Sequence, residues 1–120
     1  MILADTSLWI EHLRRGHAGL RDVLDNGQVV VHPFVIGELS LGHLKRRAEV
    51  LGLLAELAVA PAVPHEEVLE MVERPRLSGA GIGWTDAHLL ASALANGLFL
   101  WTLDRPLATA AGRIGVAWPG

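Results

Sequence analysis

The chain has 120 residues, of which 51% are hydrophobic, so it is long enough for one buried core and too short for several domains. It contains no cysteine, which excludes disulfides and thiolate metal sites and leaves oxygen or imidazole ligands for any metal. The formal net charge of −3 lacks the basic excess that is typical of nucleic-acid-binding proteins.

In the first half of the chain, short β-rich runs alternate with helical patterns. In chain order, we expect a strand at Ile2–Ala4, a helix ended by Gly16, a helix at Ala18–Asp25, a strand at Gln28–His32, a helix opened by Pro33, and a helix from His43 to about Leu57. Thr6 or Ser7 can cap the first of these helices.

The second half continues the alternation. We expect a strand at Ala58–Ala60, a helix after Pro64, a loop at Gly79–Gly83, a helix at Trp84–Asn96, a strand at Leu98–Leu103, a helix at Arg105–Gly112, and a closing strand at Ile114–Ala117. Strands that alternate with helices predict an α/β fold with a mainly parallel sheet. Residues 1–120 then form a single domain.

The distribution of apolar residues along the chain suggests neither a signal peptide nor a membrane span. Asp5 stands where a signal peptide would begin its long apolar run. The longest apolar stretch, residues 51–64, is interrupted by Gly52, Glu56 and prolines, and falls short of the roughly 20 residues that a membrane span requires. We therefore expect a soluble, cytoplasmic protein.

Four acids lie in segments that are otherwise apolar or made of small residues: Asp5, Glu38, Asp86 and Asp104. Asp5 and Asp104 end predicted strands, and the carboxyl ends of parallel strands form the edge at which open α/β sheets bind ligands. Asp86 begins a helix, whose positive end favours an anion, and Glu38 interrupts an apolar helix. Their joint placement predicts one acidic site.

Each acid also has a purely structural explanation. Asp5 can cap a helix, Asp86 can be an ordinary first-turn acid, and Asp104 can initiate a turn. Glu38 can face solvent. The structural explanation is weakest for Glu38, because a glutamate between Ile36 and Leu39 has little reason to be there.

Bringing four carboxylates together without a cation would cost several kcal/mol in desolvation and repulsion. A divalent cation removes that cost, and oxygen-only ligation suits Mg²⁺ or Mn²⁺. Without these four acids, the chain has ten Lys and Arg residues and nine Asp and Glu residues, which is a net charge of +1. The acidity of the chain is then partly the site itself, and binding to nucleic acid remains possible.

The chain resembles the PIN-domain ribonucleases, and among them the compact VapC toxins of toxin–antitoxin pairs. The resemblance rests on the segments Ala4-Asp5-Thr6-Ser7, Val35-Ile36-Gly37-Glu38-Leu39, Thr85-Asp86-Ala87-His88-Leu89-Leu90-Ala91 and Leu100-Trp101-Thr102-Leu103-Asp104-Arg105, in this order. It implies a three-layer α/β/α sandwich with four to five strands, and metal-dependent RNA cleavage with Mg²⁺ or Mn²⁺.

The same resemblance assigns roles to residues of this chain. Asp5, Glu38, Asp86 and Asp104 would be catalytic and metal-binding, and Thr6 and Thr102 would be supporting hydroxyls. Relatives often carry a further acid two places after the last one, where this chain has Pro106, so the number of metal ions is left open. A homodimer and a VapB-like antitoxin are also implied, and we expect them at apolar helix faces that carry Leu39, Leu41, Leu44, Leu51 and Leu54.

Cleavage would proceed by in-line attack of a water on the phosphodiester and leave a 5′-phosphate. Arg105 is the first candidate for contacts with the RNA backbone, and the further candidates are Arg14, Arg15, Arg74 and Arg76. We interpret His88 as a helix-packing residue. Trp84 is the one tryptophan placed to stack on a base.

Alternative interpretations stay open on sequence alone. Gly79–Gly83 lacks the lysine and the Ser/Thr ending of a phosphate loop, so we expect a connector or a lid there. A receiver-like phosphoacceptor module also pairs strand-end acids with a threonine, but needs a lysine opposite it, and Lys45 lies in a basic helical segment. A PIN nuclease of RNA processing without an antitoxin, or an inactive interaction domain, would also fit this pattern.

Overall fold

A computed structural model describes residues 1–74, 77 and 79–120 of the chain. Its strands are β1 (Ile2–Ala4), β2 (Val29–Val31), β3 (Ala58–Val59) and β4 (Phe99–Trp101). Its helices are α1 (Thr6–Arg15), α2 (Ala18–Asp25), α3 (Pro33–Leu41), α4 (Arg47–Glu56), α5 (His65–Val72), α6 (Trp84–Asn96) and α7 (Arg105–Arg113). Within these described ranges, no helix is both long enough and apolar enough to cross a membrane.

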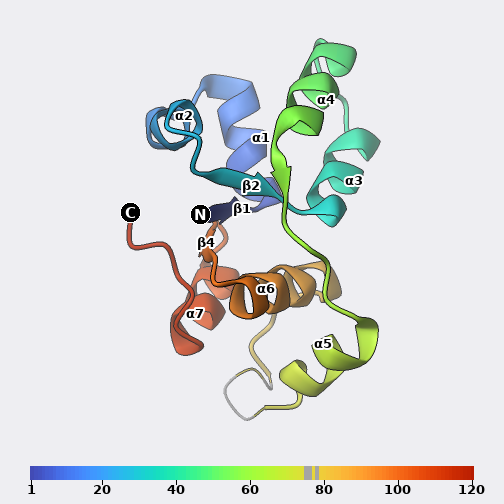
Figure 1. Ribbon diagram of the computed structural model, residues 1–120, viewed down its shortest axis with the longest axis vertical. Helices are drawn as coiled ribbons and strands as arrows, with labels where there is room; N and C mark the ends of the chain where they lie inside the picture. Colours follow the sequence, from blue (N-terminus) through green and yellow to red (C-terminus); the bar gives the residue numbers. More distant parts are fainter. Residues whose placement is uncertain (75–76, 78) are drawn as a thin grey trace.

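The elements form three layers around a parallel sheet. Helices α1 to α4 lie on one side of the sheet and α5 to α7 on the other, as Figure 1 shows. The strand order is β3-β2-β1-β4, and each neighbouring pair runs parallel. The expected α/β/α architecture with a mainly parallel sheet is confirmed.

The strand order places a ligand-binding edge between β1 and β4. From β1 the chain moves outward through β2 and β3, and then returns to the other side of β1 to form β4. The direction of winding therefore reverses between β1 and β4, and the carboxyl ends of strands at such a reversal are where open α/β sheets bind ligands. Asp5 directly follows β1, and Thr102 directly follows β4.

The sheet is the centre of the hydrophobic core. Every residue of β1 and β2 is buried, as expected for strands that helices cover on both faces. Helix α6 supplies a long buried stretch from the other side, Ala87–Ala93, which includes His88 and Ser92. Polar side chains in the core are few, and Asp5 is one of them.

Helix α4 begins later than the sequence predicts. The expected helix from His43 starts instead at Arg47, after Arg46 in a left-handed conformation with φ 54°. The run Lys45-Arg46-Arg47 explains the delay, because positive charges oppose the dipole of a helix at its amino end. Glu49 lies in the first turn of α4, where a negative charge is favourable, and the Arg47 guanidinium donates to the carbonyl of Ser40.

The carboxyl end of the sheet is also shorter than expected. β4 stops at Trp101, because the Thr102 hydroxyl bonds to Asp5 and accepts from the backbone N–H of Asp104, which turns the chain into α7. The expected closing strand at residues 114–117 is a single parallel bridge between Leu100 and Ala117. Helices at Ala18–Asp25 and Trp84–Asn96 have the predicted bounds.

Candidate active site

Asp5 is the best-fixed acid of the site. It is 4% exposed, and its backbone N–H donates to the carbonyl of Trp101 at 3.0 Å, which ties the end of β1 to the end of β4. Oδ1 accepts from the N–H of Leu8 at 3.1 Å and from the Ser7 hydroxyl at 2.6 Å, and Oδ2 accepts from the Thr102 hydroxyl at 2.5 Å. Asp5, and not Thr6 or Ser7, is therefore the N-cap of α1.

Two hydroxyls donate to this carboxylate: Ser7 follows β1, and Thr102 follows β4. Ser7 Oγ lies 3.3 Å from Thr102 Oγ1 and accepts from the N–H of Leu103 at 3.1 Å. Thr102 bonds to Asp5, and its role as a supporting hydroxyl stays a prediction. The other hydroxyl at Asp5 belongs to Ser7, whereas Thr6 is half-buried and makes no side-chain hydrogen bond within the part of the chain that the structure describes.

Asp104 combines its place at the site with a capping role. Its Oδ2 accepts from the N–H of Leu107 at 3.1 Å, which caps α7, and the side chain is exposed. Pro106 lies in the first turn of α7, a position that suits proline because the N–H it lacks would have no helical partner there. The departure from the family pattern at Pro106 thus has a structural reason.

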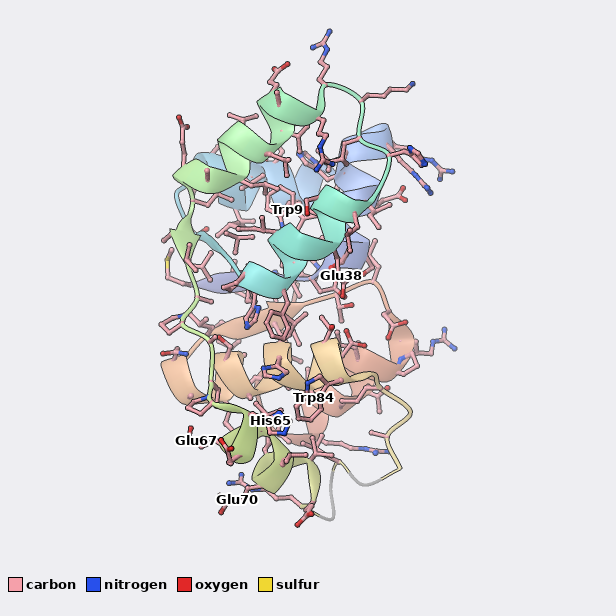
Figure 2. All side chains as sticks on the ribbon, turned by 90° about the vertical axis from the view of Figure 1, so that its right-hand side faces the viewer. Trp9, Glu38, His65, Glu67, Glu70 and Trp84 are labelled. Carbon is pink, nitrogen blue, oxygen red and sulfur yellow. The ribbon has the colours of Figure 1, made fainter. Side chains whose placement is uncertain are left out.

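Asp86 and Glu38 reach the site from opposite layers. Asp86 lies half-buried in the first turn of α6, and Glu38 lies exposed on α3. In Figure 2, Glu38 projects from α3 toward the layer that contains α6. The two acids therefore face the end of the sheet from its two sides.

The pKa values show that the four acids share one electrostatic environment. Burial raises the pKa of Asp86 above its ordinary value of 3.8, and the negative charges of Asp5, Asp104 and Glu38 raise it further. Burial also raises the pKa of Asp5, against the lowering effect of its three hydrogen bonds, and Asp104 adds to the increase. Asp86 is thus within electrostatic reach of Asp5, Asp104 and Glu38, and the shared site of the four acids stays a prediction.

No side-chain cation compensates this charge among the described ion pairs. Arg15 pairs with Glu11 at 3.6 Å and Arg46 with Glu49 at 3.9 Å, both on exposed helix surface. In residues 1–74, 77 and 79–120, no group of three or more acidic or histidine side chains is close enough together to hold a metal ion. The four acids are thus near enough to repel one another without being gathered into a chelating cluster.

The candidate RNA-contacting arginines lie on the surface. Arg105 begins α7 beside Asp104, and Arg14 and Arg15 end α1, all exposed. Arg74 is exposed after α5, and Arg76 lies outside the described residues.

A cleft of about 480 Å³ adjoins the site between α1 and α3. It contains Glu38 and Arg14 together with apolar side chains, namely Ile10, Leu13, Leu39, Leu44 and Val50. The expected apolar faces are only partly available: Leu39 and Leu54 are buried, Leu44 and Leu51 are half-buried, and Leu41 is 89% exposed.

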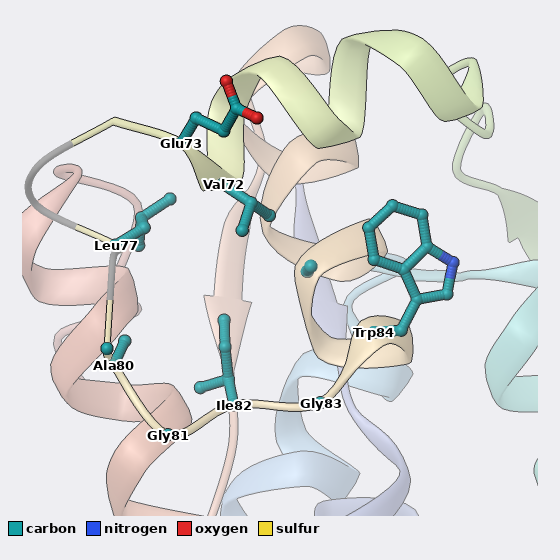
Figure 3. A pocket seen from close by; sticks show the side chains of 10 residues that line it. Val72, Glu73, Leu77, Ala80, Gly81, Ile82, Gly83 and Trp84 are labelled. Atoms are coloured by element: carbon teal, nitrogen blue, oxygen red, sulfur yellow. The ribbon is translucent and has the colours of Figure 1, made fainter.

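A second cleft, of about 410 Å³, lies between the end of α5 and the start of α6 (Figure 3). Its wall includes Val72, Leu77, Ile82 and the indole of Trp84. The predicted glycine loop forms another side of it, with Gly79 and Gly81 at positive φ of 71° and 74°.

Comparisons with known proteins identify the family of the chain. The PIN domain matches residues 2–113. The chain is 52% identical over 118 residues to Ribonuclease VapC32 from the CDC 1551 and H37Rv strains of Mycobacterium tuberculosis, covering 98% of this chain and 95% of that one. The crystal structure of PAE2754 from Pyrobaculum aerophilum superposes with a TM-score of 0.62 at 20% identity, covering 95% of this chain and 88% of the other, and supports the fold alone. The chain belongs to the PIN-domain family and is a ribonuclease of its VapC type.

Proposed function

We propose that the chain is the toxin of a type II toxin–antitoxin pair, and that it cleaves RNA phosphodiester bonds at Asp5, Glu38, Asp86 and Asp104 with the help of a divalent metal. The observation that carries the proposal is the repulsion of Asp86 by Asp5, Asp104 and Glu38, which no described ion pair relieves. Repulsion between carboxylates destabilises the folded protein, and a bound divalent cation would remove that repulsion. Membership of the VapC-type ribonucleases supports the assignment to RNA.

The residues fit a hard, oxygen-preferring cation. All four side chains offer carboxylate oxygens, the ligands that Mg²⁺ prefers, and Mn²⁺ accepts the same set. Since no three of the described acids form a compact cluster, we infer that waters complete much of the coordination, as is usual for Mg²⁺. A bound ion of this kind supplies charge neutralisation and a water that loses its proton more easily.

The residues of the chain then have separate tasks. Asp5 is held by Ser7, Thr102 and the start of α1, so it provides the fixed reference point of the site. Glu38 is exposed, and no hydrogen bond of its side chain is found in the part of the chain that the structure describes, so it is free to rotate toward substrate. A carboxylate of the group accepts the proton of the attacking water, and the 3′ oxygen leaves, which gives a 5′-phosphate.

Approach of RNA to a negative site requires positive charge nearby. Arg105 is placed for this, because it begins α7 directly after Asp104 and is exposed. Arg14 shares the 480 Å³ cleft with Glu38, whereas Arg15 is already paired with Glu11. Contacts of Arg105 and Arg14 with backbone phosphates would make cleavage weaken with salt.

The partner of the toxin would be a VapB-like antitoxin. The cleft that holds Glu38 and Arg14 joins an apolar floor to the acidic site, so a bound antitoxin segment would block Glu38 directly. The side chain of Leu41, exposed at the end of α3, is a candidate contact for this partner or for a second copy in a homodimer. We place the protein in the cytoplasm, where the RNA substrate is found.

The test is to incubate purified protein with total RNA in Mg²⁺, Mn²⁺ or chelator, and to map the cut ends. We expect cleavage with either ion, none in chelator, and 5′-phosphate products. Glu38→Gln serves as the active-site variant and Glu67→Gln, an exposed glutamate on α5, as its matched control. Cleavage that survives the chelator, or that Glu38→Gln leaves unchanged, would contradict the proposal.

The family assignment and the same cleavage assay separate the alternative functions. Family membership rules out the receiver-like module. A nuclease of RNA processing would cleave RNA but would not be neutralised by co-expression with a protein encoded beside it. An inactive interaction domain would leave RNA intact with every ion.

A further inference from the structure

A series of aromatic rings joins the two helical layers beside the acidic site. The rings of Phe34 and His88 lie 4.6 Å apart, those of His88 and Trp84 lie 4.8 Å apart, and those of Trp84 and His65 lie 5.1 Å apart. His32 contacts the other side of Phe34 at 5.0 Å. The series therefore runs from the start of α3 through α6 to α5, across the layer boundary.

The Phe34 end of this series adjoins an acid of the site. Phe34 lies one helical turn before Glu38 on α3, and side chains four residues apart share a helix face. Trp84 starts the helix turn that also carries Asp86, and its ring is linked to that of Phe34 through His88. Figure 2 shows Glu38, Trp84 and His65 on the side of the molecule that faces the viewer.

The two outer rings are open to solvent, and the ring between them is not. Phe34 is 37% exposed and Trp84 is 41% exposed, whereas His88 is 5% exposed. His88 packs edge-on against Trp84, with an interplanar angle of 87°. The ring of His88 also contacts that of Phe34 at 4.6 Å, so it packs between the two exposed rings. Its interpretation as a packing residue is consistent with this geometry.

We propose that Trp84 and Phe34 form a stacking platform for bases of single-stranded RNA close to the cleaved phosphate. This proposal rests on the proposed function, since it places bases beside the four carboxylates. Exposed rings that a buried neighbour holds in place bind a base with little loss of side-chain freedom. Every base has a face that can stack, so the platform selects unpaired strands without selecting one sequence.

Single strands are favoured over duplex RNA for a physical reason. Bases inside a duplex are already stacked on each other, and their faces are not available to a protein ring. The nearby cations, Arg14 and Arg105, hold backbone phosphates regardless of strand number, so they do not discriminate. Recognition of unpaired bases at this site therefore depends on Trp84 and Phe34.

The test compares Trp84→Leu, Trp84→Phe and Phe34→Leu with Phe99→Leu in the full chain. Phe99 is the matched control, because it is 42% exposed and packs on Trp118 at 5.5 Å, but begins β4 and so lies at the opposite edge of the sheet. Binding is measured in the Asp5→Asn background by fluorescence anisotropy, with a labelled RNA strand of about ten nucleotides, alone or paired to its complement. Cleavage of the single strand with Mg²⁺ is measured in the otherwise unchanged protein.

We expect Trp84→Leu and Phe34→Leu each to weaken single-strand binding and to raise KM about 5- to 160-fold, the range for the loss of one stacked base. Trp84→Phe should restore most of the binding, since a smaller ring still stacks, and Phe99→Leu should change nothing. Duplex binding should be the same in all variants. Melting temperatures identify any variant that fails to fold, and Trp84→Phe keeps the comparison valid in that event.

The outcomes separate this proposal from the one on which it rests. If the unchanged protein cuts no RNA with either ion, the proposed function fails. If it cuts RNA, and Trp84→Leu and Phe34→Leu match Phe99→Leu in KM and binding, the platform is refuted. The platform is also refuted if both variants weaken duplex binding as much as single-strand binding. Loss of antitoxin binding with unchanged RNA binding would assign the rings to a protein partner instead.

Discussion

Replacing Asp5 by Asn and by Ala should separate the chemistry of the site from its contribution to stability. Asn keeps the size of the side chain and an oxygen that can accept from the Leu8 N–H and the Ser7 hydroxyl. Its amide replaces the oxygen that accepts from Thr102, and the Thr102 hydroxyl can turn to accept instead. Ala removes the N-cap of α1 and leaves both hydroxyls without the carboxylate.

The magnitudes differ enough to be measured. Loss of the N-cap costs about 1 kcal/mol, and the two half-buried hydroxyls together add about 1 kcal/mol. Ala should therefore lower the free energy of unfolding by about 2 kcal/mol, or the melting temperature by roughly 8 °C for a chain of this size. Asn should stay within about 1 kcal/mol of the unchanged protein, because the weaker hydrogen bonds are offset by the relief of burial and repulsion.

The pH dependence of the free energy of unfolding gives a second test of the role of Asp5. The folded-state pKa of Asp5 is raised, so the folded protein keeps a proton at pH values where the unfolded chain has lost it. The free energy of unfolding should therefore gain from Asp5 as the pH falls through the raised pKa toward 3.8. The Asn variant has no such group, so its stability relative to the unchanged protein should decrease as the pH falls toward 3.8.

The assay is thermal unfolding in chelator, at pH 7 and at about pH 4, together with cleavage of RNA in Mg²⁺. Both variants should be inactive, and only Ala should be clearly destabilised. If Asn unfolds as easily as Ala, the ionic character of the cap matters more than the repulsion, and the account of the site is wrong. Cleavage by Asn at the unchanged rate would refute the catalytic assignment.

Further predictions concern the hydroxyl pair, a buried histidine and a surface arginine. Ser7→Ala should lower kcat clearly, while Thr6→Ala leaves it close to normal, because the Ser7 hydroxyl is the one bonded to Asp5; equal rates would contradict this. His32 caps α3 through Nδ1, and burial together with the charge of His88 lowers its pKa to about 4. The protein should therefore lose about 2–3 kcal/mol of stability as the pH falls from 6.5 toward 4, and His32→Asn, which keeps a cap, should lose less in urea titrations. Arg105→Gln should reduce the slope of log affinity for single-stranded RNA against log salt by about 0.7, the value for one phosphate contact, and an unchanged slope would remove Arg105 from the interface.

The strand-end acids were predictable because their signal is local. Asp5 follows a run whose three residues are all buried, and Asp104 closely follows β4, so each sits where a parallel strand must end. Helix bounds were predictable where caps and apolar periods agree, as at Trp84–Asn96, which Gly97 ends in a left-handed conformation. Such positions depend on the local sequence, so they can be predicted without knowledge of the tertiary contacts.

The partner of Asp5 was not predictable in the same way. Thr6 and Ser7 are adjacent, and both types of side chain can bond to a carboxylate. Which of them does so depends on the approach of Thr102, which lies 95 residues from Ser7 in the chain. The choice between Thr6 and Ser7 is made by the pairing of β1 with β4, and a single sequence does not show that pairing.

The burial of apolar residues at the expected partner surface has a similar origin. The apolar faces that carry Leu39 and Leu54 were expected to bind a partner. In the structure α3 packs on α1 and α4, and both side chains are only 2% exposed. Leu41, at the end of α3, escapes this packing. Hydrophobic periodicity shows that a helix has an apolar face, whereas the neighbours of the helix decide whether that face is used inside the molecule.

The site combines rigidity and repulsion in different residues. Asp5 is fixed by β1 and β4, while Glu38 stands on α3, Asp86 on α6, and Asp104 at the start of α7. Helices α6 and α7 contact β4, and α3 packs on α1 and α4. Because each helix is held independently, the carboxylates can stay within electrostatic reach without collapsing into hydrogen-bonded pairs. Repulsion then persists in the folded protein, and a divalent cation gains its binding energy from charges that the fold has already brought together.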